Sequence, residues 1–216
     1  MNYIIIPVTN FSQNCYIIWC KKTLHTAIID PGGEYKKIIN VLAKNKNLHI
    51  KKILITHGHL DHIGAAYILS KIYKVPILGP HKKDIFWIKN IKLQKEIFQL
   101  PECIFKNNIW LEHNQIIFVG NFFLKIYHSP GHTPGHIIFF NKLNNILFSG
   151  DIIFKGSIGR TDLPKSNYND LLNSIKNNIL SLSSNNITIL PGHGKITNIY
   201  QEILSNPFLK FYKNKI

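Results

Sequence analysis

Thr56-His57-Gly58-His59-Leu60-Asp61-His62 is the stretch that decides the fold of this chain, and it follows the apolar run Ile53-Leu54-Ile55. It brings three imidazoles and a carboxylate together at one turn. Neutral imidazoles and carboxylates are ligands that suit Zn²⁺, Fe²⁺ and Mn²⁺. Without a metal, so many polar groups in one place would compete for hydrogen-bond partners. The run therefore predicts metal binding at a strand-to-helix turn.

The spacing within the run indicates two metal positions. In an extended segment, His57 and His59 point to the same side. Asp61 and His62 enter the next predicted helix and can turn towards a second point a few ångströms away. Gly58 carries no side chain, which allows backbone and ions to approach closely. One run of sequence is therefore expected to serve two ions.

Three later segments each offer one further ligand after an apolar strand and a glycine. That is a context in which buried strands deliver functional groups to a common edge. The three candidates are His132 in His128-Ser129-Pro130-Gly131-His132-Thr133-Pro134-Gly135-His136, Asp151 in Phe148-Ser149-Gly150-Asp151, and His193 in Leu190-Pro191-Gly192-His193-Gly194.

The rest of the chain has the patterning of a layered α/β fold. Short β-rich runs and helical periodicities alternate in two successive halves of similar composition, which predicts two packed sheets with helices outside. Strands are expected at 3–8, 14–19, 25–29, 53–55, 115–119, 122–128, 136–140, 145–149 and 187–190, and helices at 34–44, 63–73, 82–98, 167–180 and 198–205.

Composition sets the outer limits of the function. With 45% hydrophobic and 17% charged residues, the chain is expected to form a single globular domain over 1–216. Cys15, Cys20 and Cys103 are odd in number and widely spaced, so no disulfide framework is predicted. The N-terminus shows no leader and no apolar stretch is long enough to cross a membrane, so a cytoplasmic protein without membrane contacts is expected.

The formal net charge of +15 raises the question of nucleic acid as a partner. Almost all basic residues are Lys, scattered over polar faces and accompanied by abundant Ile and Asn, which favours a solvated surface. Nucleic acid is therefore not the expected partner, although the excess charge could favour anionic small substrates.

Taken together, these motifs resemble the metallo-β-lactamase superfamily and, within it, the glyoxalase II (hydroxyacylglutathione hydrolase) group. The resemblance runs in family order from Asp30-Pro31-Gly32-Gly33 to His193. It implies a four-layer αββα sandwich and a binuclear site. Metal one would be held by His57, His59 and His132, metal two by Asp61, His62 and His193, and Asp151 would bridge the two.

A finer resemblance lies at Gly156-Ser157-Ile158-Gly159-Arg160-Thr161-Asp162-Leu163-Pro164. A Gly-Arg-Thr-Asp segment after the bridging aspartate looks like the short bacterial glyoxalase II-like hydrolases, and it also occurs in persulfide dioxygenases. Arg160 is the only arginine in the chain, which suggests a need for bidentate geometry. Two interpretations stay open: contact with a substrate carboxylate, or an ion pair with an acid such as Asp162.

One departure concerns glutathione. The long glyoxalase II enzymes carry a C-terminal helical extension whose basic residues hold glutathione, and a tyrosine shortly after the last histidine ligand. Here Lys195 follows His193-Gly194 and the chain ends soon afterwards. The glutathione-binding residues and the oligomeric state are not specified by the sequence.

The activity implied by the resemblance is hydrolysis of an S-2-hydroxyacylglutathione, such as S-D-lactoylglutathione, in methylglyoxal detoxification. Two divalent ions, with Zn²⁺ favoured over Fe or Mn, would lower the pKa of a shared water to about 7, and Asp61 would orient the resulting bridging hydroxide. A thiolate leaving group, with a pKa near 8.5, needs no dedicated acid. The alternatives are an Fe(II) persulfide dioxygenase, a lactone or other ester hydrolase, and an RNA-binding module.

Two neighbours of the site are expected to support it rather than to bind metal. His136 is interpreted as structural or as a partner of the ligands. Asp30 is expected to cap backbone N–H groups near the site.

Overall fold

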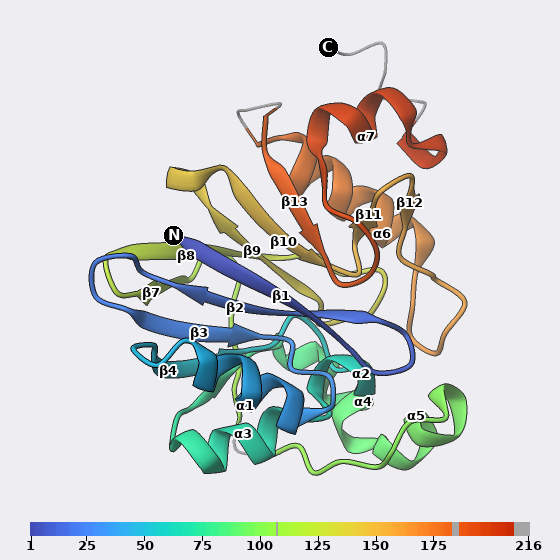
Figure 1. Ribbon diagram of the computed structural model, residues 1–216. Coiled ribbons are helices and arrows are strands. Elements are labelled where there is room, and N and C mark those ends of the chain that lie inside the picture. The colour runs from blue at the N-terminus through green and yellow to red at the C-terminus, as the bar shows by residue number, and fades with distance from the viewer. Residues whose placement is uncertain (107, 183–185, 210–216) are drawn as a thin grey trace.

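Two six-stranded sheets form the centre of the computed structural model, which describes residues 1–106, 108–182 and 186–209 (Figure 1). The first sheet opens with an antiparallel meander and continues with parallel strands. Its strands, in spatial order, are β1 (Asn2–Val8), β2 (Gln13–Trp19), β3 (His25–Ile29), β4 (His49–Leu54), β5 (Ile77–Leu78) and β6 (Asn108–Ile109).

The second sheet is mixed, with β10 and β13 parallel and side by side. Its spatial order is β14 (Thr197–Asn198), β13 (Thr188–Pro191), β10 (Ile146–Gly150), β9 (Ile137–Asn141), β8 (Phe122–His128) and β7 (Ile116–Val119). A separate two-stranded hairpin is formed by β11 (Ile153–Phe154) and β12 (Ser157–Ile158).

Helices cover the outer faces of both sheets (Figure 1). On the first sheet these include α1 (Tyr35–Lys44) and α3 (Ala66–Tyr73), and on the second α6 (Tyr168–Ser174) with the π-helical continuation η3 (Ile175–Leu180) and α7 (Ile199–Ser205). The remaining short helices are α2 (Leu60–Ile63), η1 (Lys82–Asp84), α4 (Ile85–Lys89), α5 (Ile91–Phe98) and η2 (Lys142–Asn144).

Three apolar cores separate the four layers. The first lies between the sheets, where Ile18 and Leu54 pack with Phe139 and Phe148. The second lies between the first sheet and its helices, and the third between the second sheet and α6, η3 and α7. Neighbouring residues of β2 point to opposite cores, so this strand is buried on both faces. The expected four-layer αββα arrangement is present.

Several expected elements differ from the structure in their bounds. The strand expected at 53–55 is β4, which begins at His49, and the helix expected at 63–73 is α3, which begins at Ala66 and is preceded by the separate α2. The helix expected at 82–98 is divided into η1, α4 and α5, because the Asn90 side chain donates to the Phe86 carbonyl at 2.7 Å and ends α4. The strands β5, β6, β11, β12 and β14 were not anticipated, since each has two residues and no readable periodicity.

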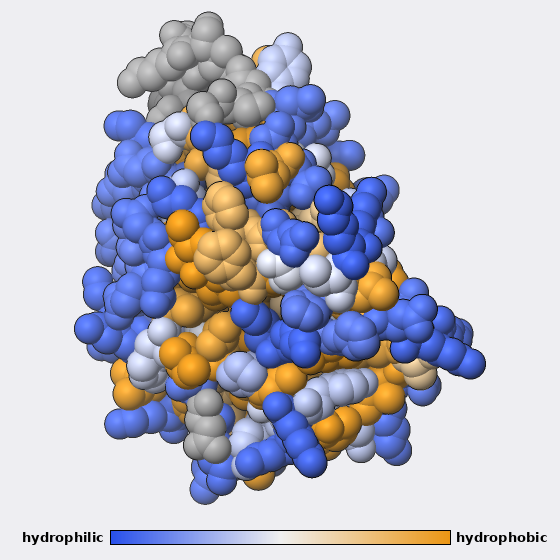
Figure 2. All heavy atoms as spheres, turned by 90° about the vertical axis from the view of Figure 1, so that its left-hand side faces the viewer, coloured by the Kyte–Doolittle hydropathy of each residue, from blue (hydrophilic) through white to orange (hydrophobic). Residues whose placement is uncertain are grey.

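β7 forms the outer edge of the second sheet on the face shown in Figure 2, where apolar and polar side chains are interspersed. Its outward residues Ile116 and Phe118 are exposed. Lys52 Nζ donates to the Phe118 carbonyl at 2.8 Å, which occupies one of the strand's edge acceptors.

The three cysteines are free, as expected. None of the helices within the described ranges is long and apolar enough to cross a membrane.

Candidate metal centre

The histidine run lies in the turn between β4 and α2, as predicted. His57 and His59 precede the helix, while Asp61 and His62 belong to it. All four side chains are nearly inaccessible to solvent. A polar cluster of this size, buried beside an apolar core, requires specific partners.

The second sheet delivers the other three predicted ligands. His132 lies in the loop between β8 and β9, and Asp151 and His193 follow the ends of the parallel strands β10 and β13. Gly192 makes the close approach possible: a Cβ at this position would lie 2.1 Å from Asp151 Oδ1. The structure therefore brings all seven predicted ligands together in three overlapping groups: His57, His59 and His132; His57, His62 and Asp151; and Asp61, His62 and His193.

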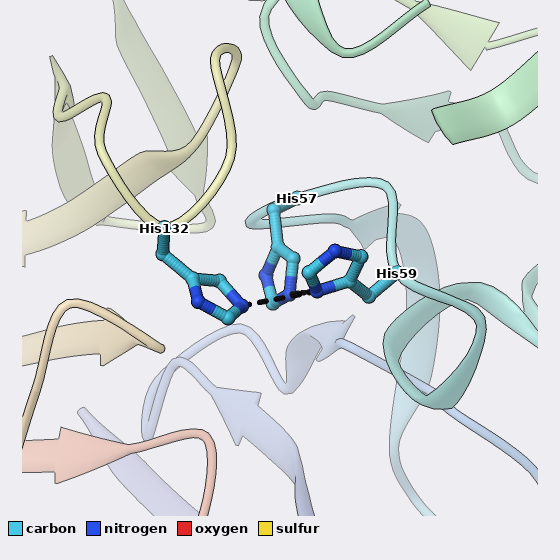
Figure 3. Close-up of side chains that lie close together, drawn as sticks. All are labelled: His57, His59 and His132. Carbon is cyan, nitrogen blue, oxygen red and sulfur yellow. Dashed lines mark hydrogen bonds between the residues drawn. The ribbon is translucent and has the colours of Figure 1, made fainter. Parts of the chain in front are cut away.

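The first group is formed by three imidazoles from two loops (Figure 3). His59 Nδ1 lies 3.1 Å from His57 Nε2 and 3.0 Å from His132 Nε2. In a tetrahedral zinc site with Zn–N bonds of 2.0–2.1 Å, two ligand nitrogens lie about 3.3 Å apart. The three nitrogens are therefore spaced nearly as a common ion would hold them.

Hydrogen bonds on the far side of the rings show which nitrogens carry lone pairs. Thr56 Oγ1 donates to Asp30 Oδ2, so it accepts from His57 Nδ1 at 3.0 Å and leaves His57 Nε2 without a proton. His132 Nδ1 donates to the Arg160 carbonyl at 2.9 Å, which leaves its Nε2 unprotonated as well. His59 Nδ1 has at most one proton and cannot satisfy both neighbours. A cation bound by the lone pairs of the three nitrogens would remove this conflict.

The remaining four predicted ligands, Asp61, His62, Asp151 and His193, form the second metal group, in which carboxylates join the imidazoles. His62 Nδ1 donates to Asp30 Oδ2 at 3.0 Å, and His193 Nδ1 donates to the Phe11 carbonyl at 3.2 Å. Their Nε2 atoms therefore face Asp61 and Asp151. His193 Nε2 lies 3.2 Å from Asp61 Oδ2, and His62 Nε2 lies 3.4 Å from Asp151 Oδ1. His62 Nε2 and Asp151 Oδ1 are buried and lack any hydrogen-bond partner among the described residues.

The two metal groups differ in the direction in which the pKa values of their histidines are shifted. Burial lowers the pKa of His57 and of His59 well below the ordinary value, and the neighbouring imidazoles add to this effect. Burial also opposes the charging of His62, but the carboxylates of Asp151 and Asp61 raise its pKa well above the usual range. Burial by itself would raise the pKa of Asp151, whereas His193 and His62 hold it well below its usual value. The first group therefore offers neutral nitrogens, and the second mixes imidazole and carboxylate.

Two supporting residues were anticipated. Asp30 accepts from the Thr56 backbone N–H at 2.7 Å, as expected of a capping residue, and it also orients His62. His136 accepts from the Asp151 N–H through Nε2 at 3.0 Å and stacks on His57 with ring centroids 4.7 Å apart. Its interpretation as a partner of the ligands rather than a ligand agrees with this geometry.

Asp84 is a supporting residue that the sequence analysis missed. Its buried carboxylate accepts from Gly58 N at 2.7 Å, Thr133 Oγ1 at 2.9 Å and Gly135 N at 2.5 Å. These donors belong to the loops that carry the first group. Burial raises the pKa of Asp84 to about 6, even though all three hydrogen bonds favour the carboxylate. Asp84 thus ties the two loops of the first group together.

The sequence analysis also missed Gln94. It lies on α5, is buried, accepts from Leu60 N at 2.7 Å and donates to the Gly58 carbonyl at 3.0 Å. The only sequence signal for either residue is a polar side chain beside the apolar positions of a helical segment. That signal does not identify a partner.

Five of the seven predicted ligands, His59, Asp61, His132, Asp151 and His193, line a cavity of about 310 Å³ with largely apolar walls, and His57 and His62 lie buried behind them. Its lining residues outside the two metal groups are Phe11, Phe98, Phe154, Ser157, Ile158, Arg160 and Leu163. Arg160 forms a two-pronged ion pair with Asp162, with both N···O distances 2.7 Å and both side chains mostly exposed. The internal ion pair considered for Arg160 is therefore present, and its guanidinium group stands at the rim of the cavity.

A larger cavity of about 1010 Å³ lies beside α2 and α3, lined by residues of α1 and of the segment 100–104. None of the seven predicted ligands lines it. Cavity size alone does not identify the reactive site in this fold, because the converging ligand atoms lie in the smaller cavity.

The family model of the metallo-beta-lactamase superfamily matches residues 8–193, which include every predicted ligand. A hydroxyacylglutathione hydrolase, GloC of Haemophilus influenzae, is 44% identical over 211 residues, covering 97% of this chain and 98% of that protein.

Two solved structures have the same fold. BLEG-1 B3 metallo-beta-lactamase superposes with a TM-score of 0.89 at 33% identity, covering 96% of this chain and 99% of that one. TTHA1623, solved in a di-iron-bound form, gives a TM-score of 0.85 at 31% identity and covers 95% and 100% of the two chains.

Proposed function

The chain belongs to the metallo-β-lactamase superfamily and is a metal-dependent hydrolase, and from this premise we propose that it hydrolyses the thioester of an S-2-hydroxyacylglutathione such as S-D-lactoylglutathione. The observation that supports metal chemistry is the convergence of imidazole lone pairs and carboxylates at one end of a small cavity. The substrate follows from the similarity to a hydroxyacylglutathione hydrolase along nearly the whole length of both chains.

Within this proposal, the centre would take two divalent ions. His57, His59 and His132 would hold the first, and Asp61, His62 and His193 would hold the second. Asp151 is suited to bridge them, because Oδ2 lies 3.5 Å from both His132 Nε2 and His193 Nε2 while Oδ1 faces His62. Zn²⁺ is the favoured ion because the donors are imidazole and carboxylate, with Fe or Mn as alternatives.

When bound, divalent ions supply a hydroxide at neutral pH and polarise the carbonyl of the substrate. The side chains of the protein orient the nucleophile and shape the cavity. Asp61, whose Oδ2 lies 3.2 Å from His193 Nε2, is placed to hold and orient the nucleophile. The phenyl rings of Phe11, Phe98 and Phe154 line the cavity and give it apolar walls beside the ligands.

The leaving group fits the composition of the cavity. Outside the metal groups, none of the described lining residues is a carboxylic acid or a histidine that could protonate it. A thiolate, with a pKa near 8.5, leaves without such a proton more readily than an amine or an ordinary alkoxide. This property favours a thioester over an amide or an ordinary alkyl ester.

The wider setting is part of the same proposal. We propose that residues 1–216 form one domain and that the enzyme acts in the cytoplasm on methylglyoxal-derived thioesters. Nucleic acid and membranes are not among its proposed partners.

The test is release of free thiol from S-D-lactoylglutathione by purified, metal-loaded protein. His57→Ala should lower kcat/KM at least a hundredfold, since it removes a nitrogen from the first group. His49→Ala, which removes an exposed histidine of β4, should leave it unchanged. Oxygen uptake with glutathione persulfide but no thiol release from the thioester would favour an Fe(II) persulfide dioxygenase instead. Turnover of lactones or simple esters alone would favour another ester hydrolase.

A further inference from the structure

The β11–β12 hairpin forms one wall of the metal cavity. Phe154, Ser157 and Ile158 line that cavity, and the Phe154 ring lies 6.1 Å from the His193 ring. The hairpin contains only two residue pairs and is hydrogen-bonded as a strand to neither six-stranded sheet. A two-stranded ribbon of this length is not stable alone. Something outside the hairpin has to fix it.

Glu202 of α7 makes that contact. It is almost completely buried, and its Oε2 accepts from the Gly156 N–H, in the turn of the hairpin, at 2.8 Å. Asn206 Nδ2 donates both to Glu202 Oε2 at 2.7 Å and to the Ser157 carbonyl at 3.0 Å. Thr197 Oγ1 donates to Oε1 at 2.5 Å. Ile153 and Ile158 anchor the two strands of the hairpin in the third apolar core, and the polar network with α7 fixes its turn.

No ion pair in the described part of the chain involves Glu202. A buried carboxylate without a cation is costly, and an apolar side chain of similar size would pack at this position at lower cost. What the carboxylate provides, and an apolar side chain would not, is acceptors for the Gly156 N–H and the Asn206 amide.

We propose that Glu202 is a positioning residue that holds the β11–β12 hairpin against α7 and thereby sets the apolar wall of the substrate cavity. This inference rests on the proposed function, in which that cavity binds the thioester. Asp151 and the Arg160 carbonyl, which accepts from His132 Nδ1, flank the hairpin, but the Asp151 N–H donates to His136 Nε2 at 3.0 Å and is held independently of it. Loosening the turn at Gly156 therefore acts first on substrate binding, which raises KM and leaves kcat nearly unchanged.

The experiment compares three variants of the metal-loaded enzyme. Glu202→Met keeps the length of the side chain and removes both acceptors. Glu202→Gln restores an oxygen for the Gly156 N–H. Asn198→Ala removes the N-cap of α7, the side chain of which accepts from Gln201 N at 2.8 Å, without removing a member of the Glu202 network. Each is measured by hydrogen exchange of peptides covering 152–158 and by steady-state thiol release.

Glu202→Met should accelerate exchange in 152–158 at least tenfold and raise KM at least fivefold, with kcat within twofold of wild type. Glu202→Gln should recover both properties to within twofold, and Asn198→Ala should change neither. Unchanged exchange in Glu202→Met, or an equal effect of Asn198→Ala, would overturn the proposal. If Glu202→Met does not fold, Asn206→Ala carries the same expectations. Wild-type protein that releases no thiol contradicts the proposed function alone, because the exchange measurement still decides the role of Glu202.

Discussion

Replacing Asp84 with alanine removes the carboxylate that ties together the two loops of the first metal group. The Gly58 N–H, the Thr133 hydroxyl and the Gly135 N–H would each lose a buried acceptor. An unsatisfied buried donor costs about 2 kcal/mol, so three cost about 6 kcal/mol. The variant also avoids burying a charge. Since the pKa of Asp84 is raised from 3.8 to about 6, this relief is about 3 kcal/mol.

The expected net loss is therefore about 3 kcal/mol at neutral pH, which lowers the melting temperature by about 6–12 °C in a domain of this size. The loss should depend on pH. A carboxyl group whose folded pKa is raised contributes stability that is fully present below pH 3.8 and is lost as the pH rises through about 6. The difference between wild type and Asp84→Ala should therefore be about 1 kcal/mol larger at pH 5 than at pH 7.5.

The assay is denaturant unfolding of metal-free protein at both pH values, with Glu96→Ala as the control. Glu96 is an exposed acid on α5, and its removal should change the free energy of unfolding by less than about 0.5 kcal/mol. If Asp84→Ala is as stable as Glu96→Ala, or if its deficit grows as the pH rises, the role assigned to Asp84 is refuted.

Three further predictions concern the metals and the cavity rim. Removal of both ions by chelation should lower the melting temperature by about 16–32 °C in calorimetry, because each ion, at a free concentration about a thousand times its dissociation constant, stabilises the fold by about 4 kcal/mol; an unchanged transition would contradict the site. In metal-free protein, burial opposes the charging of His62, but Asp151 and Asp61 raise its pKa above the ordinary value. The stability that charged His62 contributes to the fold is therefore complete below pH 6.5 and is lost as the pH rises through the raised pKa. Urea titrations from pH 6 to 9 should accordingly show falling stability without metal and little change with it. Arg160→Lys should leave the melting temperature unchanged, since the ion pair with Asp162 is exposed, but raise KM about tenfold; an unaltered KM would show that Arg160 serves only that pair.

The sequence was most informative where the chemistry is local. The run from His57 to His62 carries its own spacing, and the strand-glycine context marked His132, Asp151 and His193, so the structure brings together the residues that were singled out. The alternation of β-rich and helical segments likewise predicted two sheets with helices outside, and the three cores confirm those layers.

The supporting residues could not be predicted in the same way. Asp84, Gln94 and Glu202 are polar residues in helical segments, where a solvated position is the ordinary expectation. The donors that bond to Asp84 lie 26–51 residues from it in the sequence. Two partners of Gln94 lie 34 and 36 residues from it, and Gly156 lies 46 residues from Glu202. Only the packed structure shows that these side chains are buried against the loops they hold. Arg160 was predicted only in part. Its ion-pair partner Asp162 is two residues away in the sequence and was named, but the exposure of the pair could not be predicted from the sequence.

The most direct test of the central claim is elemental analysis of freshly purified protein, paired in the same session with thiol release from S-D-lactoylglutathione. Two ions in one cluster of seven ligands predict close to two metals per chain together with turnover of the thioester. One iron per chain without release of thiol would contradict the binuclear thioesterase and favour the dioxygenase.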